Sequence, residues 1–264
     1  AGGIQSAQPR GQGEAAQKAA LRGAPAVKNC RYPQLDILRG FALANMICYH
    51  ALWDLVNLHG LELSWYDGWP GFLWQQFICW SFILLAGFCQ PFSRRPVRHG
   101  VMLLAAGALV SAVTMAVLPE DPIQWGVLTF LGTATLLFQW LGPLLDRCPP
   151  RWGLLACAAL FGLTRQVGSG LVAGYSVIPE TLYHTGWLGN FLGFPAPEFA
   201  SSDYFPLLPW LFLYGAGWFL HAVWRTGEEH EVPKRKPFPV LEWMGRHSLA
   251  LYLLHQPALY GALL

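Results

Sequence analysis

The sequence has few charged residues: Asp, Glu, Lys and Arg make up 12% of its 264 residues, against about 25% in ordinary soluble domains. Hydrophobic residues make up 54%, and 13 Trp, 16 Phe and 9 Tyr give the aromatic excess that is typical of membrane interfaces. This composition predicts an integral membrane protein. The formal net charge of +2 is small and the basic residues are scattered over short connections, so we expect no nucleic acid among its partners.

The six cysteines show no CxxC pair and no zinc-ligand spacing, so we expect reduced thiols and no metal site. Residues 1–30 lack the apolar core of roughly 7–15 residues that a signal peptide requires. They are rich in Ala, Gly and Gln, and we expect them to form a disordered cytoplasmic tail. Residues 31–264 are then expected to form a single transmembrane domain.

Apolar segments close to the ~20 residues that cross a ~30 Å hydrocarbon core follow one another along this domain. They should be helical, because an open strand would leave backbone groups without partners in lipid. The sequence thus predicts an all-α bundle of about seven transmembrane helices, at 36–58, 71–91, 98–118, 124–145, 152–168, 205–225 and 246–264. Lys and Arg gather in every second connection, and Arg165 is the exception among the others. This pattern predicts a cytoplasmic N-terminus and a C-terminus outside.

The first span carries Asp36, Arg39, His50, Asp54 and Asn57. Each ionisable group inside hydrocarbon costs about 2.5–3.5 kcal/mol, so several in one span require an explanation. At about 100° per residue, all five fall within a helix sector of about 60°. This polar face should therefore border a protein interior or an aqueous cavity, and we interpret it as the lining of a reaction path across the membrane.

His50 lies about 21 Å of helix rise beyond Asp36, and Asp54 follows it one turn later. A carboxylate at that spacing can hold one ring nitrogen of the imidazole and leave the other to accept a proton, which is a general-base arrangement. An interhelical hydrogen bond that locks the bundle explains the same pair, and metal ligation is a third reading. Arg39 can hold a phosphate, and an ion pair with Asp36 three residues earlier is compatible with that role.

The last span begins GRHSLALYLLHQP. Arg246 and His247 are expected at its cytoplasmic mouth, close to Arg39. His255 lies deeper, where it can either face His50 across the bundle or satisfy a neighbouring backbone carbonyl.

The connection 169–204 is long for a loop and holds aromatic residues with few charges. It suits a cap over a binding site, and interfacial packing without a ligand explains it equally well. Trp187 and Asp203 in this connection, and His59 in the first outer connection, are candidate contacts for a substrate on the outer side.

Five segments in order carry a family resemblance: LDILRGFALANMICYHALWDL, LLAGFCQPFSRRPVRHGVMLLAAGALVSAVT, GVLTFLG, DYFPLLPW and GRHSLALYLLHQP. Together they resemble the catalytic-domain family of heparan-α-glucosaminide N-acetyltransferase, and in particular its short bacterial branch, over roughly residues 31–264. The resemblance implies a transmembrane acyltransferase. Such an enzyme would move an acetyl or short acyl group from cytosolic acetyl-CoA to a sugar amine or hydroxyl on the outer side.

The first span is also similar to membrane acyltransferases that O-acylate cell-surface glycans, in which ten residues separate a basic residue from a catalytic histidine. Arg39 and His50 have that spacing. The resemblance therefore implies His50 as the catalytic residue, assisted by Asp54, with His59 as the alternative histidine. It implies acyl-CoA binding by Arg39, which Asp36 would position.

The same interpretation extends acyl-CoA binding to Arg246 and His247, and acceptor binding to Asp203, Trp187, His59 and His255. The expected location is the inner membrane of a bacterium, as a multi-pass protein, with a homodimer as one assembly that the relatives suggest. Two rival hypotheses use the same polar face. One is a transporter or exporter of a small anion or glycan unit, and the other is a non-catalytic membrane protein in which this face is a buried packing seam.

Overall fold

The computed structural model describes residues 32–225 and 238–263, so the expected tail at residues 1–30 lies outside the described residues. Seven helices of 14 residues or more make up most of this part of the chain. They are α2 (Pro33–Asn57), α3 (Trp69–Cys89), α4 (Pro96–Val117), α5 (Val127–Leu145), α6 (Pro150–Leu163), α8 (Leu207–Arg225) and α10 (Ser248–Leu263). Proline lies in the first turn of α2, α3, α4 and α6, where its fixed φ favours the helix and its missing N–H costs no bond.

The remaining elements are short. The helical ones are η1 (Gln90–Phe92), η2 (Val167–Ser169), η3 (Glu180–His184), α7 (Trp187–Leu192) and α9 (Pro239–Arg246). Strands β1 (Leu171–Val172) and β2 (Tyr175–Ser176) form an antiparallel hairpin. The sequence predicted an all-α bundle, and the described fold is mostly helical. Gly174 in the turn has φ +82°, a conformation that glycine adopts without strain.

Four helical segments in the described residues are long and apolar enough to cross a membrane: Trp69–Phe92, Pro96–Val117, Val127–Leu145 and Leu207–Arg225. They confirm the prediction of a mostly helical multi-pass membrane protein. The predicted spans at α2, α6 and α10 are helices too. A total of about seven spans and their orientation stay predictions.

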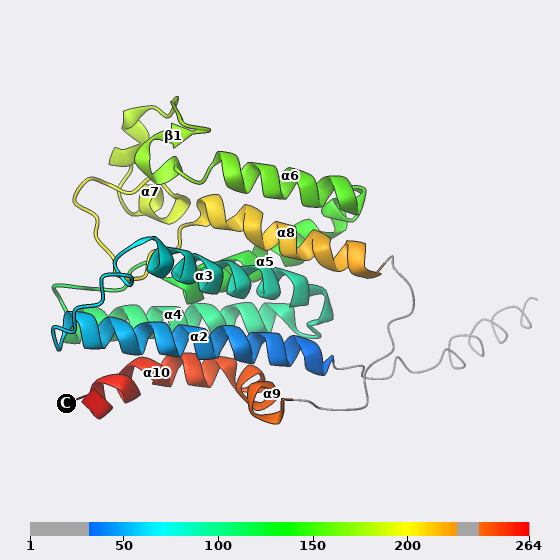
Figure 1. Cartoon of the computed structure of the whole chain (residues 1–264). Helices are drawn as coiled ribbons and strands as arrows, with labels where there is room; N and C mark the ends of the chain where they lie inside the picture. The colour runs from blue at the N-terminus through cyan, green and yellow to red at the C-terminus, as the bar shows by residue number, and fades with distance from the viewer. Residues whose placement is uncertain (1–31, 226–237, 264) are drawn as a thin grey trace, which may run out of the picture.

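The long helices alternate in direction (Figure 1). As a result, the connections before α3 and α5 and the hairpin before α8 gather at the end of the bundle where the C-terminus lies, and α9 lies at the opposite end. Helices α2, α9 and α10 form one side of the bundle and α6 and α8 the other, with α3, α4 and α5 between them.

Small residues allow the helices to approach closely, as is usual where helices pack inside a membrane. On α2, Gly40 faces the backbone of Leu241 on α9, and Gly245 of α9 faces the backbone of Asp36 with no room for a side chain. The same relation holds between α3 and α8, where Gly87 lies against the backbone of Tyr214. The α2–α9 contact brings Arg246 next to the polar face of α2, and so prepares the site.

Candidate functional site

A cavity of about 1060 Å³ lies inside the bundle. Its walls come from α2, α3, η1, α4, α5, α8, α9 and α10, with Arg165 and residues 202–205 closing one region. Asp36, Arg39 and His50 of the polar face of α2 all border this space. At these three residues the face borders a cavity, whereas the hypothesis of a buried packing seam requires packed side chains along the whole face.

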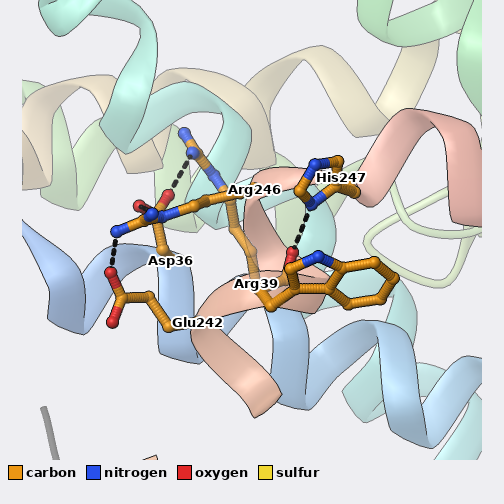
Figure 2. A network of polar contacts seen from close by, with 6 residues as sticks. Asp36, Arg39, Glu242, Arg246 and His247 are labelled. Carbon is orange, nitrogen blue, oxygen red and sulfur yellow. Dashed lines mark hydrogen bonds and ion pairs between the residues drawn. The ribbon is translucent and has the colours of Figure 1, made fainter. Parts of the chain in front are cut away.

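The region of the cavity near the start of α2 is rich in arginine, and we call it the arginine end (Arg39, Arg94, Arg246). The predicted ion pair is present: Arg39 Nη1 lies 3.4 Å from Asp36 Oδ1. Arg246 Nε lies 3.8 Å from Asp36 Oδ2, and Arg246 also donates to Glu242 (Figure 2).

These ion pairs place the two kinds of charge differently. The side chains of Asp36 and Glu242 are only 4% exposed, whereas those of Arg39 and Arg246 are 34% and 37% exposed. The carboxylates are therefore buried, whereas the two arginine side chains stay partly exposed and border the cavity. Guanidinium groups bind phosphate through paired N–H donors, so the arginine end is suited to a phosphate or diphosphate.

His50 borders the same cavity from α2, and its ring lies 5.0 Å from the ring of His255 on α10. Nδ1 of His255 lies 2.5 Å from the backbone oxygen of Tyr252. Both positions considered for His255 therefore occur together: it satisfies a carbonyl and faces His50.

Asp54 is completely buried and does not border the cavity. Its Oδ1 accepts a hydrogen bond from Gln256 Nε2 on α10, at 3.3 Å. Within the part of the chain that is described, no hydrogen bond joins Asp54 to His50. The role of Asp54 in orienting the imidazole therefore stays a prediction. Its observed partner comes from α10, and residue spacing within α2 cannot reveal a partner on another helix.

At the opposite end, the cavity is bordered by residues of the interhelical connections and the start of α3, and we call this the loop end (Gln76, Arg165, Asp203). Asp203 Oδ2 accepts hydrogen bonds from the backbone N–H of Val127, at 3.1 Å, and from the hydroxyl of Tyr252, at 3.4 Å. Burial raises the pKa of this carboxyl, and the two hydrogen bonds oppose the shift. Asp203 thus joins the connection before α8 to both α5 and α10.

Five predicted site residues border the cavity: Asp36, Arg39, His50, Asp203 and Arg246. Five do not: Asp54, His59, Trp187, His247 and His255.

Those outside the cavity have other surroundings. Trp187 is 69% exposed and its ring stacks 6.3 Å from that of Trp125. His247 is exposed and its Nδ1 lies 2.9 Å from the backbone oxygen of Trp243, and His59 is exposed after the end of α2.

Arg165 and Gln76 border the cavity although sequence reasoning assigned them no role at a site. The sequence does contain one signal for Arg165, because it is the exceptional basic residue among the outer connections. Among the described residues, no group of three or more His, Cys, Asp and Glu side chains could hold a metal ion.

The model of the family described as "Heparan-alpha-glucosaminide N-acetyltransferase, catalytic" matches residues 31–257. This match confirms the resemblance inferred from the five sequence segments, and it implies a membrane protein with acyltransferase-like function. The chain belongs to the heparan-α-glucosaminide N-acetyltransferase catalytic-domain family. No curated protein and no solved structure matches it.

Proposed function

We propose that the protein moves an acetyl or other short acyl group from cytosolic acetyl-CoA to the amine or hydroxyl of a sugar on the other side of the membrane. Family membership supports the reaction class. The single observation that carries the proposal is that one cavity borders the arginine end, His50 and the loop end. A donor and an acceptor that enter from different regions of this cavity can meet beside the imidazole.

At the arginine end, Arg39 and Arg246 would hold the phosphates of CoA, with Asp36 positioning both guanidinium groups through its ion pairs. His247 follows Arg246 and would contribute at the mouth of the site. His50 lies eleven residues beyond Arg39, a helix rise of about 16 Å. The extended pantetheine arm of CoA would cover this separation and bring the thioester toward His50.

In the transfer step, His50 accepts a proton from the amine or hydroxyl of the acceptor as the nitrogen or oxygen attacks the thioester carbonyl carbon. A C–N or C–O bond forms, the C–S bond breaks, and the CoA thiolate leaves and takes up a proton. Asp203 would bind the acceptor at the loop end, and His59 and Trp187 would contact it nearer the surface. His255 would support His50 from α10, and Asp54, which accepts a hydrogen bond from Gln256, would hold α10 in place beside α2.

Seven spans with a cytoplasmic N-terminus would place the arginine end inside the cell and the loop end outside. This orientation follows from the Lys and Arg distribution, and it suits a donor made in the cytosol. We propose the inner membrane of a bacterium as the location and a homodimer as the assembly to be tested.

The experiment combines purified protein in detergent, acetyl-CoA labelled in the acetyl group, and a panel of amino sugars and neutral glycans. We expect label in at least one acceptor, and we expect acetyl-CoA to raise the apparent Tm because it binds the folded state. Absence of both effects would contradict the proposal.

A cavity bordered at both ends also suits a transporter. That hypothesis predicts flux of an anion or glycan across vesicles in the absence of acetyl-CoA. The acyltransferase predicts no such flux, and label in the acceptor only when acetyl-CoA is supplied.

A further inference from the structure

Arg165 lies just beyond the end of α6, and its side chain borders the loop end of the cavity. Aromatic faces surround its guanidinium group: the centroids of Trp210, Phe161 and Trp80 lie 5.0, 5.4 and 5.8 Å from the guanidinium carbon. It also donates to Oε1 of Gln76 on α3. Three helices therefore fix the position of this cation.

At the residues that the structure describes, no ion pair balances the charge of Arg165. Across residues 32–225 and 238–263, no Asp or Glu lies within ion-pair distance of Arg165, whereas Arg39 and Arg246 both pair with Asp36. A partly buried cation without a counter-ion is unfavourable, and contacts with aromatic faces offset only part of that cost. An anion in the adjacent cavity would supply the missing charge.

Hydrogen-bonding capacity points the same way. A guanidinium group carries five N–H donors in a rigid fork, and the amide oxygen of Gln76 accepts from one nitrogen of Arg165. The remaining donors suit the two or three oxygens of a carboxylate or sulfate group. Because the aromatic rings hold the guanidinium plane in place, the side chain would lose little conformational entropy on binding.

Asp203 gives the loop end a second, acidic group that is anchored by Val127 and Tyr252. The cavity thus offers one fixed cation and one carboxyl group in the region assigned to the acceptor. This combination matches a sugar that bears both an amine and an acidic substituent.

We propose that Arg165, held by Gln76, binds an anionic substituent of the acceptor, so that the preferred acceptors are acidic amino sugars. This inference rests on the proposed function and specifies its acceptor class. Carboxylate and sulfate ester share the relevant chemistry, and the test separates them.

The test uses three acceptors that differ only at C6: glucosamine, glucosamine 6-sulfate and 2-amino-2-deoxyglucuronic acid. For the unaltered protein we expect kcat/KM to be about tenfold or more higher for at least one acidic sugar than for glucosamine, as a charged hydrogen-bonded contact provides. Which acidic sugar is preferred identifies the substituent. Equal values for all three would overturn the inference.

Arg165→Gln removes the charge and should bring the ratio of acidic to neutral kcat/KM to about one, mainly through KM for the acidic sugar. Arg165→Lys keeps the charge without the fork and should retain an intermediate ratio. Arg151→Gln is the matched control, because Arg151 is exposed in the first turn of α6 and does not border the cavity. A ratio that is unchanged in Arg165→Gln would overturn the inference.

Binding without acetyl-CoA separates the two proposals. The acidic sugar should raise the apparent Tm of the unaltered protein and of Arg165→Lys more than that of Arg165→Gln. If that difference is found but no sugar is acetylated, the anion site stands and the proposed function fails. If sugars are acetylated with neither a charge preference nor a differential Tm shift, the function stands and the anion site fails.

Discussion

The rings of His50 on α2 and His255 on α10 lie 5.0 Å apart, with an angle of 54° between their planes. Nε2 of His255 is buried and has no hydrogen-bond partner among the residues described. Buried polar atoms without partners are uncommon in proteins and often mark functional positions. The two histidines therefore connect α2 to α10 beside the cavity, which His50 borders.

We expect His255→Phe to preserve packing, because the ring volume is retained, and to leave the apparent Tm within a few degrees. If His255 supports His50, kcat should fall by about tenfold. The effects of His255→Phe and His50→Ala should not add, because residues that act as a unit are non-additive. Full additivity in kinetic measurements on the double variant would show that the two histidines act independently.

Asp54 is expected to matter for stability. It is fully buried, and Gln256 is its hydrogen-bond donor. Asp54→Asn can still accept that bond, so we expect a small change in Tm and kcat. Asp54→Ala leaves the Gln256 amide unpaired at a cost of about 1–3 kcal/mol.

Thermal unfolding and steady-state kinetics on both Asp54 variants distinguish the roles. Gln256→Leu serves as the matched partner variant. A hundredfold loss of kcat in Asp54→Asn at unchanged Tm would instead show that this carboxylate orients His50 during turnover.

Arg39 is expected to act on donor binding. Arg39→Gln should raise KM for acetyl-CoA by about tenfold with a smaller change in kcat, because it removes one charged phosphate contact. The difference from the unaltered protein should shrink at high salt, which screens partly exposed charges. Arg147→Gln, an exposed residue after α5 that does not border the cavity, is the control. An unchanged KM in Arg39→Gln would remove Arg39 from the donor site.

Asp203 predicts a pH dependence of stability. Burial raises its pKa above the ordinary value of 3.8, so the folded state binds this proton more tightly than the unfolded state does. The resulting stabilisation is complete below pH 3.8 and is lost as the pH rises through the folded-state pKa. Asp203→Asn removes the titration, so the difference in apparent Tm between the unaltered protein and this variant should change between pH 3.8 and the folded-state pKa of Asp203. A difference in Tm that stays constant over this pH range would contradict the raised pKa of Asp203.

Much of the fold could be predicted from local sequence. The apolar segments 98–118 and 205–225 correspond to α4 (Pro96–Val117) and α8 (Leu207–Arg225), because hydrophobic length and flanking prolines define such helices. The segment 152–168 was too long: α6 ends at Leu163, and the chain then turns through η2 into the hairpin. Hydropathy does not distinguish the end of a helix from an apolar connection that follows it.

The candidate site divides in the same way. The ion pair between Asp36 and Arg39 follows from their spacing within one helix, and the structure contains it. The bond from Gln256 to Asp54 and the contact of Arg165 with Gln76 join residues far apart in the chain. These contacts depend on which helices pack against each other, and a single sequence does not show which helices do so.

The most direct test of the account is acetyl transfer by the unaltered protein and by His50→Ala, with labelled acetyl-CoA and an amino-sugar acceptor. His184→Ala, in an exposed position of η3, is the control for the loss of a histidine. We predict that His50→Ala lowers kcat by a factor of about 10²–10⁴ while acetyl-CoA still raises the apparent Tm. Turnover at the unaltered rate in His50→Ala, with the same acceptor, would contradict the account.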